Sequence, residues 1–150
     1  MPSMAEIEFS INLPANAEKL FKIATDYERY TKFFEGYLQS VKVIEKSKNK
    51  THTEEIFQFK IIFNHEIVQE SIHTVSDSKK IHTEVVKGPF KGSVIDIVYE
   101  SHQTGTKVIV NADYKIALKY KIISPIIKQK YRIILTGLLY KMNTIALNDS

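Results

Sequence analysis

Two glutamates interrupt apolar strand faces, and a carboxylate in such a place can hold a ligand or move a proton. Glu55 falls on the same predicted face as Phe57, and Glu70 falls on the face of Val68 and Ile72. An unpaired buried carboxylate is costly, so each should lie near a strand end, form an ion pair or face a wet cavity. Glu70 stands in the middle of its predicted strand. We therefore expect Glu70 to contact a polar group of a ligand, and the alternative is a structural ion pair.

The same kinds of side chain can support acid–base catalysis. Together with Glu70, the tyrosines Tyr99 and Tyr114 could exchange protons with a bound molecule. Nothing in their spacing demands catalysis, so no catalytic residue is expected. The chain has no cysteine, which excludes disulfides, thiolate nucleophiles and cysteine-ligated metal. Phosphate-binding loops, metalloprotease helix motifs and serine-nucleophile elbows are also absent from the sequence.

The histidines invite a metal hypothesis, and their spacing argues against it. His65 and His73 would share a strand face but lie about 26 Å apart, too far for joint ligation at about 2 Å per bond. His73 and His82 face each other only if 77–78 forms a two-residue hairpin loop, with Glu84 diagonal to His73. Such side chains on an open sheet face are usually solvated. We expect neither a metal nor a cofactor.

The hydrophobic pattern predicts the elements that would position these side chains. Residues 7–13 alternate as a first strand, which Pro14 ends. Asn16 can cap a helix, and Asp26 can cap a second short helix that closes at Gly36. Two short helices joined tightly would form a wedge.

Strands separated by turn residues follow from Leu38 to Ile116, which predicts an antiparallel meander. Turn chemistry marks the reversals at 46–50, 76–79, 87–93 and 101–106. A further reversal near 61–64 is needed to keep the strands at a normal length. Phe90 stands inside one of these turns, where side chains are usually polar.

The last predicted element is a long amphipathic helix over about 125–147. Its apolar residues recur on one broad face: Ile127, Tyr131, Ile134, Leu135, Leu138, Met142 and Ile145. Such a helix would be roughly 33 Å long and could lie along the whole concave face of the sheet. Gly137 inside it costs about 1 kcal/mol relative to alanine. Either another part of the structure approaches the helix closely at Gly137, or the protein tolerates this cost in stability.

Length and composition predict one domain, residues 1–150, with 43% hydrophobic and 25% charged residues. Acidic Glu6 and Glu8 stand where a signal peptide would be basic, and no segment can span a bilayer, so we expect a cytoplasmic protein. The net charge of +4 comes from dispersed lysines, which favours a solvated surface over a nucleic-acid site. Lysines around a cavity could also dock the chain on a membrane surface.

The order strand, helix pair, strand meander and long helix is that of the α+β helix-grip fold, a curved antiparallel β-sheet wrapped around a C-terminal α-helix. The stretch LPANAEKLFKIATDYERYTKFF at 13–34 resembles the opening of the START-like SRPBCC superfamily, which includes polyketide cyclase/dehydrase and coenzyme-Q-binding proteins. GPF at 88–90 and NADYKI at 111–116 look like the coenzyme-Q-binding branch. Ile97 stands where that branch commonly has a tryptophan.

The resemblance implies a hydrophobic cavity between sheet and helix. Phe90 would form part of its lid or wall, and the alternative is ordinary core packing. The implied function is binding or carriage of a hydrophobic small molecule of the quinone, polyketide or lipid class. A cyclase- or dehydrase-like enzyme and a ribosome-associated basic module are the alternatives. The residues expected to contact the ligand are Phe34, Phe57, Phe59, Glu70, Val85, Phe90, Ile95, Ile97, Tyr99, Tyr114, Tyr131, Leu135 and Leu138.

Overall fold

The computed structural model describes residues 3–34, 36–58 and 66–148, and within these ranges it contains the predicted elements in the predicted order. The strands form a single antiparallel sheet in the order β1-β7-β6-β5-β4-β3-β2. Their bounds are β1 (Ser3–Leu13), β2 (Leu38–Lys46), β3 (Lys50–Phe57), β4 (Ile67–Ser76), β5 (Lys80–Lys87), β6 (Val94–His102) and β7 (Gly105–Ile116). The predicted reversal near 61–64 lies outside the described residues.

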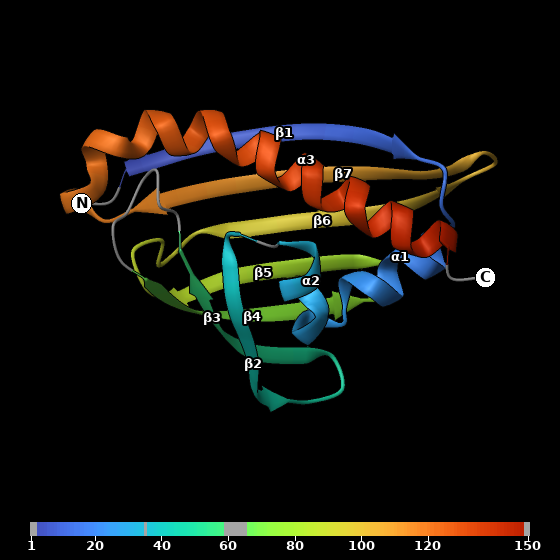
Figure 1. Ribbon diagram of the computed structural model, residues 1–150, viewed down its shortest axis with the longest axis horizontal. Helices are drawn as coiled ribbons and strands as arrows, with labels where there is room; N and C mark the ends of the chain where they lie inside the picture. Colours follow the sequence, from blue (N-terminus) through green and yellow to red (C-terminus); the bar gives the residue numbers. More distant parts are fainter. Residues whose placement is uncertain (1–2, 35, 59–65, 149–150) are drawn as a thin grey trace.

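The helices lie on one side of this sheet (Figure 1). After β1 come α1 (Ala17–Ala24), the 3-10 turn η1 (Tyr27–Arg29) and α2 (Tyr30–Phe33), and after β7 come η2 (Leu118–Ile123) and the long helix α3 (Ser124–Asn148). Figure 1 shows α3 crossing the sheet from one end to the other, with α1 near its C-terminal end. The helix-grip prediction is confirmed.

The two predicted helix caps have different outcomes. The side chain of Asn16 accepts hydrogen bonds from the backbone N–H groups of Glu18 and Lys19 at 2.8 and 3.3 Å, so this cap is confirmed. Asp26 makes no capping hydrogen bond, and the helix that follows it begins as a 3-10 turn. Its carboxylate lies 4.0 Å from Nε of Arg29 instead. The prediction of Asp26 as a cap is therefore wrong.

The turn between β4 and β5 is one residue longer than the two-residue loop considered for 77–78. Ser76 pairs with Lys80, and Lys79 adopts a left-handed conformation with φ of 57°. Three-residue hairpin loops commonly end in such a residue. As a result His73 pairs with Thr83, and His82 pairs with Thr74, so the two histidines do not face each other.

The joint between β1 and α1 is held by two distant elements, α3 and β7. The side chain of Asn143 on α3 accepts from the backbone N–H of Ala15 at 2.9 Å, and the hydroxyl of Thr106 on β7 donates to the carbonyl of Ala15 at 2.7 Å. Gly105 has φ of +141°, and a Cβ there would lie 2.2 Å from the carbonyl oxygen of Leu13. Only glycine allows the chain to approach this closely.

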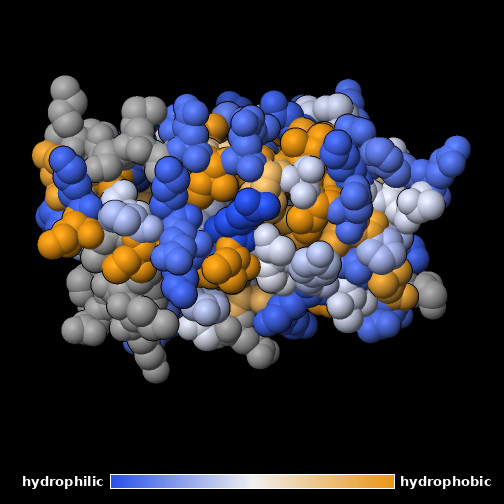
Figure 2. All heavy atoms as spheres, turned by 90° about the horizontal axis from the view of Figure 1, so that it is seen from above, coloured by the Kyte–Doolittle hydropathy of each residue, from blue (hydrophilic) through white to orange (hydrophobic). Residues whose placement is uncertain are grey.

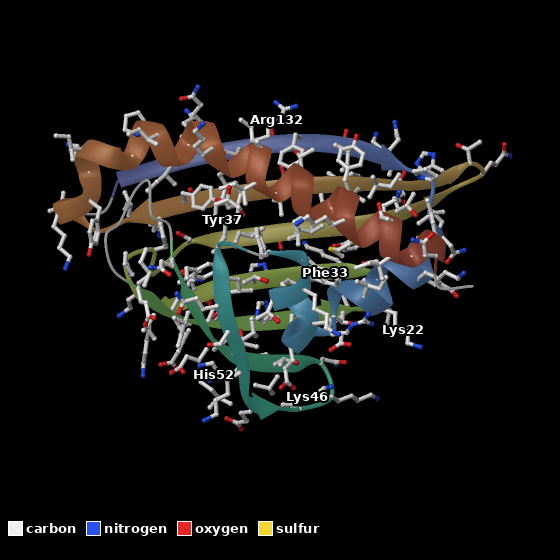
Figure 3. All side chains as sticks on the ribbon, viewed as in Figure 1. Lys22, Phe33, Tyr37, Lys46, His52 and Arg132 are labelled. Atoms are coloured by element: carbon white, nitrogen blue, oxygen red, sulfur yellow. The ribbon has the colours of Figure 1, made fainter. Side chains whose placement is uncertain are left out.

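The core lies between the sheet and the C-terminal half of α3. Leu139 and Met142 are almost fully buried there, against Val108 and Val110 of β7. Figure 3 shows Phe33 on the side of α2 that faces α3, whereas Lys22 points outward from α1. The N-terminal half of α3 is covered less well, and this difference leaves open space between helix and sheet.

Candidate functional site

A cavity of about 230 Å³ lies between the concave face of the sheet and α3. Its wall is built from inward-facing residues of β2 to β7, from η1 and α2, and from α3. Most of this wall is apolar. The predicted contact residues that line it are Phe34, Phe57, Val85, Phe90, Ile95, Ile97, Tyr99, Tyr114, Tyr131, Leu135 and Leu138. Their contact with a ligand stays a prediction, and Phe59 lies outside the described residues.

Glu70 lies on the opposite face of the sheet, away from the cavity. Its Oε1 is 2.8 Å from Nε2 of His52, and its Oε2 is 3.1 Å from Nζ of Lys87. The hydrogen bond from Lys87 lowers the pKa of the Glu70 carboxyl. Figure 3 shows His52 on the outer side of the sheet, directed away from α3. The expected ligand contact of Glu70 is therefore corrected to the alternative, a structural ion pair.

The reason is that the alternation in β4 is inverted with respect to polarity. Gln69, Ser71 and His73 point into the molecule and are buried, whereas Val68 is 51% exposed. The prediction placed the apolar residues of this strand in the core. It is wrong for β4, because this strand turns its polar residues inward and valine outward. This inversion is itself a sign that the inner face of β4 serves something other than packing.

These inward-facing residues make one end of the cavity polar. Neighbouring strands contribute Thr53 and Glu55 from β3 and Thr83 from β5. Glu55 pairs in register with Gln69, Thr53 with Ser71, and His73 with Thr83, so the polar side chains occupy adjoining positions. Of these residues, the sequence pattern singles out only Glu55 as a polar side chain on an apolar face. It assigns Gln69, Ser71 and His73 to the outer face, because it places Val68 and Ile72 inside.

His73 is fixed at this polar end by contacts on every side. Its Nε2 lies 2.9 Å from the hydroxyl of Thr53, and its Nδ1 lies 2.8 Å from the hydroxyl of Thr83. The ring of Tyr27 stacks on the imidazole with centroids 4.2 Å apart. Burial lowers the pKa of His73 to about 4, so the ring is neutral at neutral pH.

Glu55 is the buried acid of the cavity. Its Oε1 lies 4.0 Å from Nε2 of His73, and its Oε2 has no hydrogen-bond partner among the described residues. Burial raises the pKa of Glu55 to about 7, although the nearby side-chain hydroxyls of Ser71 and Thr53 act in the opposite direction. The carboxyl is therefore able to gain or lose a proton near neutral pH.

Tyrosines supply most of the remaining polar atoms. The ring of Tyr131 on α3 meets that of Tyr114 at 84°, with centroids 4.1 Å apart. The hydroxyls of Tyr27 and Tyr114 are buried and have no partner among the described residues, whereas the hydroxyl of Tyr30 donates to the carbonyl of Ala24. Burial raises the pKa of Tyr27 to about 12, so this phenol stays protonated at neutral pH.

Phe90 lies on the cavity wall, in the turn between β5 and β6, and is partly exposed. Gly88 has φ of +112°, and a Cβ there would lie 2.9 Å from the carbonyl oxygen of Val68. The backbone N–H of Ala117 donates to the carbonyl of Pro89 at 2.9 Å, which ties this turn to the start of η2. Phe90 therefore occupies the wall near the N-terminal end of α3.

In the described ranges no group of three or more histidine, cysteine, aspartate or glutamate side chains could hold a metal ion. None of the helices within those ranges is long and apolar enough to cross a membrane.

The sequence profile of a family described as "Polyketide cyclase / dehydrase and lipid transport" matches residues 13–142. A search of curated proteins gives no match.

Solved structures of low sequence identity share the fold. A protein of Thermus thermophilus is 15% identical, with a TM-score of 0.83 over 97% of this chain and 99% of that one. The ZhuI aromatase/cyclase of a Streptomyces species is 11% identical, with a TM-score of 0.77 over 93% and 94%. Norcoclaurine synthase of Thalictrum flavum, in complex with dopamine and hydroxybenzaldehyde, is 12% identical, with a TM-score of 0.72 over 99% and 90%.

Proposed function

Since the chain belongs to the polyketide cyclase/dehydrase and lipid transport family, we propose that it binds a hydrophobic small molecule in the cavity between the sheet and α3. The observation that carries this proposal is the cavity itself, which has a mostly apolar wall and a few polar groups gathered at one end. Small-molecule sites have this composition, because apolar surface supplies affinity and a few polar groups fix the orientation.

The size of the cavity favours a compact ligand. Its volume of about 230 Å³ is below the roughly 300–1,000 Å³ common for ligand sites, so one or two fused rings fit better than a long acyl chain. Aromatic side chains such as Phe57, Phe90 and Tyr131 in the wall suit a flat ring system. A quinone or an aromatic polyketide fragment meets these conditions.

A cyclase- or dehydrase-like enzyme is the second candidate, and Glu55 is the observation that favours it. A general acid or base works best when its pKa lies near the operating pH, and burial raises the pKa of Glu55 to about 7. Binding is placed first because His73, the other proton-transfer side chain nearby, has both ring nitrogens within hydrogen-bonding distance of threonine hydroxyls.

The binding proposal is tested by measuring the melting temperature with a panel of quinones, aromatic polyketides and fatty acids. A ligand at 100 times its dissociation constant should add about 2.7 kcal/mol to the free energy of unfolding. Ile97→Trp fills the cavity and should abolish the effect, whereas Val98→Trp alters the opposite face of β6 and should retain it. A melting temperature unmoved by the whole panel, with no small molecule copurifying by native mass spectrometry, would overturn the proposal.

A further inference from the structure

We propose that the polar end of the cavity binds a hydroxyl group carried by an otherwise apolar ligand, and that Oε2 of Glu55 accepts the hydrogen bond from that hydroxyl. This inference rests on the proposed function, because it concerns the same cavity. It adds the requirement that the ligand carries a hydroxyl group, and it names Oε2 of Glu55 as the atom that recognises this group.

The first observation is the unpartnered oxygen. The Glu55 residue is 8% exposed, and its Oε2 is buried without a hydrogen-bond partner among the described residues. Buried polar atoms almost always have a partner, since an unsatisfied one costs free energy comparable to a lost hydrogen bond. Glu55 lines the cavity, so a ligand can reach this oxygen.

The second observation is that the protein offers Glu55 no counterion among the described residues. His73 is the ionisable group that lies 4.0 Å from the carboxylate, and burial keeps its imidazole neutral at neutral pH. The cavity lining includes one lysine in the described ranges, Lys130, whose side chain is exposed on α3. A ligand with a carboxylate or phosphate at this end would meet an acid and no buried cation, which excludes anionic ligand groups here.

A neutral hydroxyl satisfies the site better than the other ligand groups. It can donate to Oε2 of Glu55 and accept a hydrogen bond at the same time, whereas an ether or a ketone cannot donate. An ammonium group could also donate and would pair with the carboxylate, but taking both charges out of water can cost more than their attraction returns in an apolar cavity. Tyr27, whose buried hydroxyl has no partner among the described residues, stacks on His73 at this end and is a candidate donor to the ligand oxygen.

The test compares 1-naphthol with 1-methoxynaphthalene, which differ in the ability to donate, by fluorescence titration. At a pH above the pKa of Glu55, where the carboxyl is ionised, the wild-type protein should bind the naphthol about tenfold more tightly, the ratio expected for a hydrogen bond to a charged acceptor. In Glu55→Leu the ratio should fall to about one, and in Glu55→Gln it should take an intermediate value because the amide oxygen still accepts. Glu54→Gln, on the outer face of the same strand, is the matched control and should keep the wild-type ratio.

Circular dichroism of each variant confirms that it is folded, and Glu55→Gln keeps the shape of the side chain if Glu55→Leu does not fold. Equal wild-type affinity for the two probes, or discrimination that survives in the Glu55 variants, overturns this inference while the proposed function stands. If neither probe binds and the wider panel also fails, both are overturned. If neither naphthalene probe binds but another compound from the panel does, the same comparison is made between the hydroxyl and methyl-ether forms of that compound.

An independent observation concerns the surface beside the cavity. From Tyr114 to Asn148 the sequence contains no aspartate or glutamate, and its basic residues are Lys115, Lys119, Lys121, Lys128, Lys130, Arg132 and Lys141. Four large apolar side chains of the same segment are exposed, namely Leu118 (56%), Ile122 (88%), Ile126 (44%) and Ile133 (63%). Figure 2 shows hydrophobic residues interleaved with hydrophilic ones at the end of the molecule where α3 begins.

We infer that η2 and the N-terminal half of α3 dock on an anionic lipid surface. Exposed isoleucines next to lysines suit the interface of a bilayer, where apolar side chains enter the acyl boundary and lysines meet anionic headgroups. Binding to a nucleic acid would not explain why the apolar side chain of Ile122 is exposed. The same segment contributes Ile127, Lys130 and Tyr131 to the cavity lining, so docking would bring the cavity close to the membrane.

The test is cosedimentation with phosphatidylcholine vesicles that contain either no anionic lipid or roughly one-third phosphatidylserine. Binding should require phosphatidylserine and should fall at least fivefold in Lys119→Ala/Lys121→Ala and in Ile122→Ser/Ile126→Ser. The controls are Lys42→Ala/Lys46→Ala and Ile44→Ser, which change a lysine pair and an exposed isoleucine on β2. No binding to the anionic vesicles, equal binding to both kinds, or loss in the control variants overturns this inference.

Discussion

Nε2 of His73 lies 4.0 Å from Oε1 of Glu55, at the polar end of the cavity, and burial shifts the pKa values of these two groups in opposite directions. A buried acid is held protonated and a buried histidine is held neutral, so the pair carries no full charge in slightly acidic solution. The two groups therefore have opposite effects on stability over nearly the same range of pH.

The sign follows from proton uptake. Glu55 has its pKa raised from 4.5 to about 7, so the folded state holds a proton that the unfolded state has lost, and stability falls as pH rises through this range. His73 has its pKa lowered from 6.5 to about 4, so stability rises with pH over its range. Each contribution is about 3 kcal/mol at most. We predict that they nearly cancel between about pH 4.5 and 6.5.

Glu55→Gln removes one side of this balance. The free energy of unfolding of the variant relative to wild type should grow by about 3 kcal/mol as pH rises from about 4.5 to 7.5, as measured by urea unfolding. Glu54→Gln, the neighbour on the outer face, should show no such growth. If the difference in the free energy of unfolding between Glu55→Gln and wild type does not vary with pH, this result would contradict the placement of Glu55 in a desolvated site.

The sequence predicted the fold well because local signals and the global arrangement agree along most of the chain. Alternation located the inner faces of β6 and β7, where Ile97 and Tyr114 line the cavity. It failed on β4, because the inner face there carries Gln69 and His73 and the polarity is inverted. The partners of His73 come from two other strands, so they depend on a pairing register that includes a three-residue loop and could not be predicted from local sequence.

Gly137→Ala should stabilise the protein. Gly137 lies inside α3, and a Cβ there would meet no atom of the described residues within 4 Å, so among them the alternative of a close approach at this point is wrong. Alanine is favoured over glycine in a helix interior by about 1 kcal/mol, and thermal unfolding should show a gain of up to that amount. Gly105→Ala is the contrasting variant and should destabilise, since its Cβ would lie 2.2 Å from the carbonyl oxygen of Leu13. Destabilisation by Gly137→Ala would contradict the packing of α3.

Leu138→Ala should cost less than Leu20→Ala, although both leucines are buried. Leu20 is 0% exposed in the packed core and is absent from the cavity lining, so its truncation should cost about 2–5 kcal/mol. Leu138 faces the cavity, where fewer contacts are lost, and we expect a cost nearer the lower end of that range. Chemical denaturation of both variants measures the difference. Equal losses would indicate that α3 packs on the sheet as tightly at Leu138 as at the core.

Phe90→Ala should weaken ligand binding more than it weakens the fold. Phe90 is partly exposed on the cavity wall, and its turn is held by the backbone hydrogen bond from Ala117 to Pro89, which the substitution leaves in place. The loss of stability should therefore be smaller than the roughly 3–5 kcal/mol typical of truncating a buried aromatic. Phe33→Ala, at a residue that is 2% exposed, provides the core reference. The stability of both variants and the affinity of Phe90→Ala for a panel ligand should be measured together. If Phe90→Ala loses as much stability as Phe33→Ala and its affinity for the ligand is unchanged, Phe90 belongs to the core and not to the binding site.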